Sequence, residues 1–159
     1  MGDAAALAWP GAVAVRLLIL AGLGLVVGCG PDIEALRFAD LEGARAVFLE
    51  NIEAIQTRDK ERYLSHYLDT SDLVAASPEG IVLGYASLAA ARRASDEWPD
   101  SLVATEPTLV WLAPGVVYGA YRYAVRQWGA MSTGWSERVL VKTGAGWKIA
   151  VTSVLPATP

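Results

Sequence analysis

The sequence predicts an α+β fold, with about three helices in its first half packed on one face of a curved, mostly antiparallel sheet. Residues 41–98 carry helical periodicity broken by turn signals, whereas residues 102–155 carry β-type runs separated by short turns. Helices followed by a run of strands are typical of this class. The 159 residues fit one domain, and 53% hydrophobic against 19% charged residues allows a real core.

An apolar segment near the N-terminus stands apart from this pattern. Residues 17–28 read LLILAGLGLVVG, without a charge, after Arg16 and directly before the only cysteine, Cys29. Twelve residues rise about 18 Å as a helix, too short for a hydrocarbon core of about 30 Å. The tetrapeptide VVGC resembles the lipobox of bacterial lipoproteins, which implies that Cys29 is the lipidation site and the first mature residue. The alternative is a single-span anchor over residues 12–28, with Cys29 incidental.

The lipobox resemblance sets the expected organisation and location of the chain. Residues 1–28 form a lipoprotein signal peptide, residues 29–40 a tether, and residues 41–156 the folded domain. Within the tether, residues 30–40 also suit a helix lead-in. Acyl chains on Cys29 would anchor the protein stably to a membrane. We therefore expect an exported, membrane-anchored lipoprotein of the bacterial cell envelope.

The helical part contains three predicted helices. Apolar residues from Leu41 to Ile55 share one face of a helix over residues 41–57. Asp59 is the predicted N-cap of a second helix with the sequence KERYLSHYL. After turn signals and a short apolar run at residues 81–83, SLAAARRASDEW predicts a third helix that ends at Pro99.

The β part begins after Pro99 and reads as a meander. Pro107 separates two short runs, and turns are expected at Ala113-Pro114-Gly115 and at Gly144-Ala145-Gly146. The predicted strands cover residues 102–105, 108–112, 116–128, 135–143 and 147–155. Trp147, which follows the last hairpin turn, is expected to be structural.

Four stretches resemble the nuclear transport factor 2-like superfamily, the SnoaL-like and ketosteroid-isomerase-like α+β cones. They are DTSD (69–72), SPEGIVLGYASLAAA (77–91), VVYGAYRYAVRQWG (116–129) and RVLVKTGAGWKIAVTSV (138–154). The resemblance covers about residues 40–155 and implies a conical cavity between a bent sheet and the helices. Some members catalyse isomerisation, dehydration or cyclisation there, and others bind ligands or serve as dimerisation domains, so the fold does not fix the function.

The resemblance gives one candidate catalytic base, Asp72, and this chain lacks the Asp or His that enzymatic members often carry in the last strand. Enzymatic members often carry Asp or His in the last strand, but residues 150–154 read AVTSV. Asp72 matches an acidic position at the cavity mouth and is the remaining candidate base, with Tyr67 or Tyr121 as hydrogen-bond donor. The alternative is that Asp69 or Asp72 caps a turn. His66 is the only histidine, and no metal site or other cofactor is expected.

The aromatic residues point to an apolar ligand, or else to ordinary core packing. Tyr121 and Tyr123 have period-two spacing and share one strand face, opposite Tyr118, Arg122 and Arg126. Aromatic side chains with polar tips suit an apolar ligand with few polar groups. The ligand-binding candidates are Tyr63, Tyr67, Trp98, Tyr121, Tyr123 and Trp135.

Charged residues favour no particular partner. Arg92 and Arg93 suit a phosphate or headgroup contact, or more simply a solvated helix face, and Glu137 and Arg138 read as exposed sheet residues rather than a dyad. The net charge of −4 argues against nucleic acid. We expect a lipid-anchored, non-catalytic protein that binds a small apolar ligand in its cavity or a protein partner on its open sheet face. The sheet face also suits a homodimer. An isomerase, dehydratase or cyclase that uses Asp72 is the alternative, and a purely structural accessory domain is a third.

Overall fold

The computed structural model describes residues 32–157. Its helices and strands follow one another as α1 (Ile33–Gln56), α2 (Lys60–Ser65), β1 (Val74–Ser77), β2 (Gly80–Leu83), α3 (Tyr85–Ala94), β3 (Ser101–Ala113), β4 (Val116–Gln127), β5 (Ala130–Thr143) and β6 (Gly146–Pro156). None of the helices in this part of the chain is long and apolar enough to cross a membrane.

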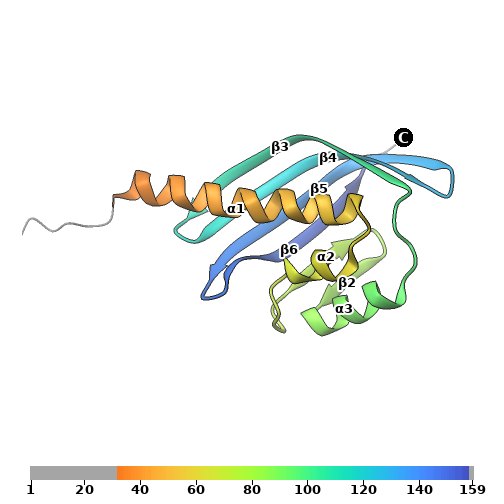
Figure 1. The fold of residues 1–159 in the computed structure, drawn as a ribbon, viewed down its shortest axis with the longest axis horizontal. Coiled ribbons are helices and arrows are strands. Elements are labelled where there is room, and N and C mark those ends of the chain that lie inside the picture. The colour runs from red at the N-terminus through yellow and green to blue at the C-terminus, as the bar shows by residue number, and fades with distance from the viewer. Residues whose placement is uncertain (1–31, 158–159) are drawn as a thin grey trace, which may run out of the picture. The chain divides into compact units, whose positions relative to one another are not determined.

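The strands form one open, mixed sheet in the order β2-β1-β6-β5-β4-β3. Strands β1 and β6 pair in parallel, and all other neighbours pair antiparallel. The long strands β3 to β6 curve around α1, while α2 and α3 lie near the short strands β1 and β2 (Figure 1). This arrangement confirms the predicted α+β fold, with helices packed on one face of a mostly antiparallel sheet.

Helix α1 begins eight residues earlier than the periodicity predicted. Asp32 caps its first turn, and its Oδ1 accepts the amide hydrogens of Glu34 (3.0 Å) and Ala35 (3.3 Å). Residues 33–40, predicted as part of a tether or as a helix lead-in, are therefore helical. The prediction missed them because Ile33 and Phe38 are 50% and 69% exposed, so their apolar side chains form no buried stripe.

The other two helices end earlier in the chain than predicted. Asp59 caps α2 as expected, with its Oδ1 accepting from the amide of Arg62 (2.9 Å). Helix α3 begins directly after Gly84 and ends at Ala94, four residues before the predicted end. The chain leaves the helix there because Ser95 is extended, and its carbonyl oxygen accepts from Lys60 Nζ (2.6 Å).

Two strands are longer than predicted. Strand β3 runs through Pro107 because it is an edge strand, and a register shift beside Glu106 (φ 55°) absorbs the irregularity. Strand β5 begins at Ala130 because its backbone pairs with β4 from there onward, although the first side chains are exposed. The tight turn between β4 and β5 is Trp128-Gly129, where both φ angles are positive.

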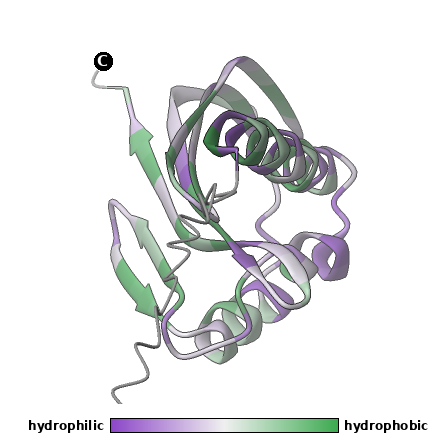
Figure 2. Ribbon diagram, turned by 90° about the vertical axis from the view of Figure 1, so that its left-hand side faces the viewer, coloured by the Kyte–Doolittle hydropathy of each residue, from purple (hydrophilic) through white to green (hydrophobic). Residues whose placement is uncertain are grey.

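The core lies between α1 and the concave face of the sheet, where α1 is seen nearly end-on in Figure 2. Two glycines permit this close packing. A Cβ atom on Gly119 would lie 2.7 Å from the fully buried ring of Phe48, and one on Gly43 would lie 2.5 Å from Trp147 Nε1. Trp147 is 8% exposed, which agrees with its predicted structural role.

A buried carboxylate fastens α1 to the loop between β3 and β4. Asp40 is fully buried, and its Oδ2 accepts from the amide of Gly115 (2.7 Å) and from Trp111 Nε1 (3.2 Å). Its Oδ1 accepts from Lys142 Nζ (3.2 Å). Burial alone raises the pKa of Asp40, but these three donors together hold that pKa below its ordinary value. The contact links α1 to β3, to β5 and to the loop between β3 and β4.

Candidate functional site

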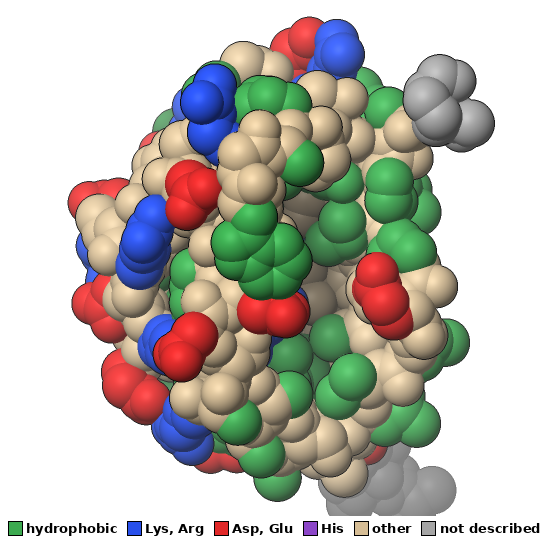
Figure 3. Space-filling view, turned by 90° about the vertical axis from the view of Figure 1, so that its right-hand side faces the viewer, with side chains coloured by type: hydrophobic (Ala, Val, Ile, Leu, Met, Phe, Trp, Pro, Cys, Tyr) green, Lys and Arg blue, Asp and Glu red, His purple; other side chains and the backbone are tan. Residues whose placement is uncertain are grey.

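A cavity of about 650 Å³ lies between the concave face of the sheet, α3 and the β1–β2 hairpin. Figure 3 looks into its open side, where hydrophobic side chains surround a hollow and acidic side chains lie near the rim. Most of the lining side chains are aliphatic or aromatic: Ile55, Tyr63, Ala75, Ala76, Pro78, Val82, Leu88, Ala91, Pro99, Leu102, Tyr121, Tyr123, Val125, Val154 and Pro156. Volume and lining suit a small, mostly apolar molecule.

The deep part of the cavity contains a buried arginine. Arg138 comes from the inner face of β5 and is 2% exposed. Its Nε donates to Asn51 Oδ1 (3.1 Å), its Nη1 to Ser136 Oγ (3.0 Å), and its Nη2, at a longer distance, to the Tyr121 hydroxyl (3.4 Å). The guanidinium carbon also lies 5.0 Å and 5.7 Å from the ring centres of Tyr121 and Phe48. The guanidinium is thus held by neutral groups.

Two further tyrosines extend the polar group around Arg138 toward α2. The Tyr67 hydroxyl donates to the Tyr63 hydroxyl (2.6 Å), and Tyr63 itself lines the cavity. Burial raises the pKa of Tyr67 well above its ordinary value, and burial also raises the pKa of Tyr123. Both hydroxyls therefore stay protonated near neutral pH, and they are available as hydrogen-bond donors rather than as bases.

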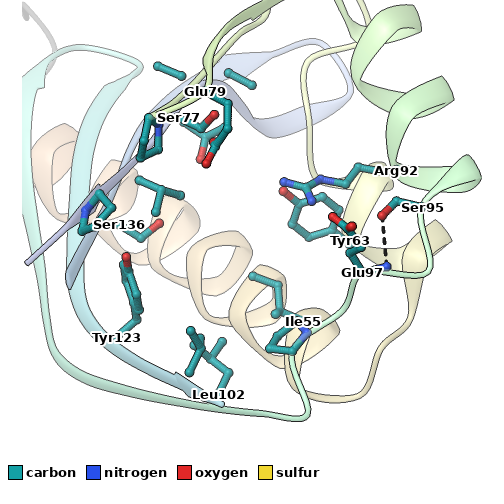
Figure 4. A pocket seen from close by; sticks show the side chains of 18 of the residues that line it. Ile55, Tyr63, Ser77, Glu79, Arg92, Ser95, Glu97, Leu102, Tyr123 and Ser136 are labelled. Atoms are coloured by element: carbon teal, nitrogen blue, oxygen red, sulfur yellow. Dashed lines mark hydrogen bonds between the residues drawn. The ribbon is translucent and has the colours of Figure 1, made fainter. Parts of the chain in front are cut away.

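The mouth of the cavity carries exposed charges of both signs. Figure 4 shows Arg92, Glu97 and the ring of Tyr63 on one side of the space, with Ser136 and Glu79 on the other. The Arg92 guanidinium lies 5.8 Å from the centre of the Tyr63 ring. Arg92, Glu97 and Glu79 are all exposed. Water and dissolved salt screen these exposed charges, so they bind a charged ligand only weakly.

The structure brings together three of the six ligand-binding candidates. Tyr63, Tyr121 and Tyr123 line the cavity, and Tyr123 can lie flat across β5 because its neighbour is Gly134, where a Cβ atom would lie 2.6 Å from the tyrosine hydroxyl. Tyr67 reaches this group only through its bond to Tyr63. Trp98 packs edge-on against Tyr63, with ring centres 5.4 Å apart, and supports the cavity wall from behind.

Two candidates lie elsewhere. Trp135 is 40% exposed on the convex face of β5, where it pairs with Arg122 and Leu155, so it does not face the cavity. Asp72 lies in an exposed turn, where its carboxylate accepts from the Ser71 hydroxyl (3.4 Å). It is not a lining residue, and the structure does not bring it together with Tyr67 and Tyr121.

The predicted exposure of Arg138 is wrong. Arg138 shares a strand face with Ser136 and Leu140, both buried, whereas Glu137 lies on the opposite, convex face. Glu137 accepts there from the hydroxyls of Tyr118 (2.7 Å) and Ser153 (2.9 Å). The sequence does not show which face of β5 is the inner one, because both faces carry apolar residues. Leu140 lies on the face of Arg138, and Val139 lies on the face of Glu137. Asn51 was also missed, because a polar residue next to the apolar stripe of a helix gives no sign in the sequence that it is buried.

The remaining charged candidates have ordinary environments. Arg93 forms an exposed, two-pronged pair with Glu61 (both contacts 2.8 Å), as expected for a solvated helix face. His66 is buried, its Nε2 lies 3.4 Å from Glu50, and burial lowers its pKa. Within residues 32–157, no group of three His, Cys, Asp or Glu side chains is placed to hold a metal ion.

The convex face of the sheet carries many exposed apolar side chains. The two edge strands, β2 and β3, expose Leu83 (63%) and Val110 (45%). The central strands β5 and β6 expose Trp135 (40%) and Leu155 (49%). Tyr118, Arg122 and Arg126 lie on this face of β4, opposite Tyr121 and Tyr123, as the period-two spacing predicted. A homodimer across this face stays a prediction. Cys29 lies outside the described residues, and its lipidation also stays a prediction.

Comparison with known proteins finds likeness in structure but not in sequence. No family model and no curated protein matches the chain. A nuclear transport factor 2-like protein of unknown function from Shewanella oneidensis is similar, with a TM-score of 0.61 and 17% identity over 74% of this chain and 97% of that chain. A candidate ketosteroid isomerase from Parabacteroides distasonis has a TM-score of 0.63 and 14% identity, covering 73% and 89% of the two chains.

A third similar structure is a candidate scytalone dehydratase from Novosphingobium aromaticivorans. Its TM-score is 0.64 at 9% identity, over 79% of this chain and 89% of that chain. The structural likeness shows the fold, and at identities this low it does not extend to the chemistry of the cavity. The described part of this chain has the nuclear transport factor 2-like fold, an α+β cone with an open six-stranded sheet.

Proposed function

We propose that this protein is an exported, lipid-anchored envelope protein whose conical cavity binds a small, mostly apolar molecule without converting it. The observation that carries the binding role is the cavity itself. Its volume of about 650 Å³, its aliphatic and aromatic lining and its few inward hydroxyls match the usual features of small-molecule sites. The lipobox resemblance at Cys29 supports the anchored location.

The ionisable groups of the cavity favour binding over catalysis. An isomerase, dehydratase or cyclase needs a base within reach of a donor that stabilises the developing negative charge. Among the described residues that line the cavity there is no Asp or His, and the two glutamates, Glu79 and Glu97, are exposed at the mouth. The deep tyrosines and Arg138 supply donors without an adjacent base.

Obstructing the cavity is expected to weaken binding of a neutral apolar probe. Ala91 lines the cavity from α3, whereas its exposed neighbour Ala90 does not. We expect Ala91→Trp to weaken binding of 2-naphthalenemethanol about tenfold or more, about 1.4 kcal/mol, because the indole occupies ligand space. Isothermal titration calorimetry on the full chain in detergent, with the heat of probe entering empty micelles subtracted, measures this.

Ala90→Trp is the matched control, since it adds the same side chain on the neighbouring position of the same helix. It should bind the probe as the unaltered protein does. Equal affinity in all three proteins would mean that the probe binds outside the cavity, and would count against the proposed binding role.

Lipidation is tested at Cys29. When the full chain is expressed in a bacterium fed an alkyne-labelled fatty acid, we expect the label on the protein and the protein in the membrane fraction. Cys29→Ser should lose both, because the thiol is the proposed acyl acceptor. A Cys29→Ser protein that stays in the membrane fraction would instead support the single-span anchor.

A further inference from the structure

Arg138 is a buried charge whose partner is absent from the described chain. Its side chain is 2% exposed, and a buried guanidinium is costly unless an opposite charge accompanies it. Within residues 32–157, no Asp or Glu side chain forms an ion pair with it. The groups that hold it are the neutral oxygens of Asn51, Ser136 and Tyr121.

These contacts orient the guanidinium without satisfying it. A guanidinium has five N–H donors in a rigid plane, and three of them are used here. The side chain nevertheless lines the cavity. A planar carboxylate is the group that best matches the geometry of an arginine fork, and it would also supply the missing negative charge.

Nearby side chains also favour an anion at this depth. The Tyr63 hydroxyl accepts from Tyr67 and so keeps its own hydrogen for another acceptor. The mouth, by contrast, carries Arg92, Glu79 and Glu97, exposed charges of both signs that attract an anionic group only weakly. The apolar body of such a ligand would lie among aliphatic side chains such as Leu102 and Val125.

We propose that the cavity binds an amphipathic organic acid, with its carboxylate hydrogen-bonded to Arg138 and its apolar body against Leu102 and Val125. This inference rests on the proposed binding function and narrows its ligand class. It explains why an arginine occupies the inner face of β5, where its strand neighbours Ser136 and Leu140 are buried. The guanidinium acts by recognition alone, so no bond is made or broken.

The test compares two probes that differ only in the charged group, 2-naphthoate and 2-naphthalenemethanol. Calorimetry on the full chain is expected to show at least tenfold tighter binding of the carboxylate. Arg138→Gln should remove this preference, so that the two probes bind the variant with similar affinity. Arg122→Gln is the matched control, because Arg122 lies on the convex face of the neighbouring strand and pairs with Glu106 (3.6 Å).

A second variant, Arg138→Lys, tests the proposal even if Arg138→Gln does not fold. Arg138→Lys keeps the charge but loses the planar fork, so it should retain only part of the preference for the carboxylate. The preference in the unaltered protein should also persist when salt is raised, because a buried pair is poorly screened, whereas a contact with exposed Arg92 would weaken.

The outcomes separate this inference from the function on which it rests. If the alcohol binds in the cavity and the carboxylate binds no better, the acid-binding inference is overturned and the binding function stands. The same holds if Arg92→Gln, rather than Arg138→Gln, removes the preference. If neither probe responds to Ala91→Trp, the binding function itself fails.

Discussion

Replacing Asp40 with alanine is expected to lower the free energy of unfolding by about 2–4 kcal/mol, since each buried donor left without a partner costs about 1–3 kcal/mol. Asp40 is fully buried and accepts hydrogen bonds from Gly115, Trp111 and Lys142. Alanine leaves the Gly115 amide and the Trp111 indole unpaired, while half-exposed Lys142 can turn to solvent. Urea denaturation of the two proteins at neutral pH measures the loss.

Asparagine at the same position separates the hydrogen bonds from the charge. Both neutral donors bind one oxygen of Asp40, so an amide oxygen in its place keeps both. We expect Asp40→Asn to cost only about 1 kcal/mol, the usual difference between a charged and a neutral acceptor. Equal losses for alanine and asparagine would show that the buried donors do not carry the stability.

The stability contributed by Asp40 is also expected to depend on pH. The pKa of Asp40 in the folded protein lies below its ordinary value, because the Gly115 amide, the Trp111 indole and Lys142 outweigh the effect of burial. Its contribution is therefore complete above the unfolded pKa of about 3.9 and is lost as pH falls through the folded pKa. The gap between unaltered protein and Asp40→Asn should narrow as pH falls below about 4.

Adding a methyl group at Gly119 is expected to cost about 1–3 kcal/mol of folding free energy, the usual cost of overpacking a core. A Cβ atom there would lie 2.7 Å and 2.8 Å from ring carbons of Phe48, which is fully buried. Phe48 in turn stacks edge-on with Tyr121, with ring centres 5.9 Å apart, so the ring cannot move without disturbing the cavity wall. Chemical denaturation of Gly119→Ala measures the cost.

A double-mutant cycle identifies the cause of that cost. In a Phe48→Leu background the ring is gone, and Gly119→Ala should cost at least about 0.5 kcal/mol less than in the unaltered protein. Gly144→Ala is the control, because a Cβ atom there meets nothing within 4 Å, and its effect should stay within about 0.5 kcal/mol of zero. Additive costs for positions 48 and 119 would mean that the ring is not the obstacle.

Local rules in the sequence determined the order of elements and much of the fold. Asp59 was predicted as an N-cap because a side-chain oxygen beside a helix start satisfies free amides, and it does so for Arg62. Tyr121 and Tyr123 were predicted to share a face because strand side chains alternate, and both line the cavity. Such predictions succeed because they depend on neighbours within a few residues.

Local rules failed where a distant contact overrides the pattern. Strand β3 continues through Pro107 because only one of its edges is paired, which depends on the order of strands in the sheet. The first turns of α1 are helical because Asp32 caps them and Asp40 fastens them to the β3–β4 loop, not because they bury an apolar stripe.

The inner end of the site was decided by tertiary structure alone. Arg138 meets Asn51 across 87 residues of sequence, and no spacing rule brings the two together. Alternation fixed that Glu137 and Arg138 face opposite ways, but the choice of the inner face depends on which side of β5 the helix α1 covers. The sequence by itself therefore determined the α+β class and the strand face that Tyr121 and Tyr123 share. The packing of α1 on the sheet decided that this face lines a cavity with a buried arginine at its inner end.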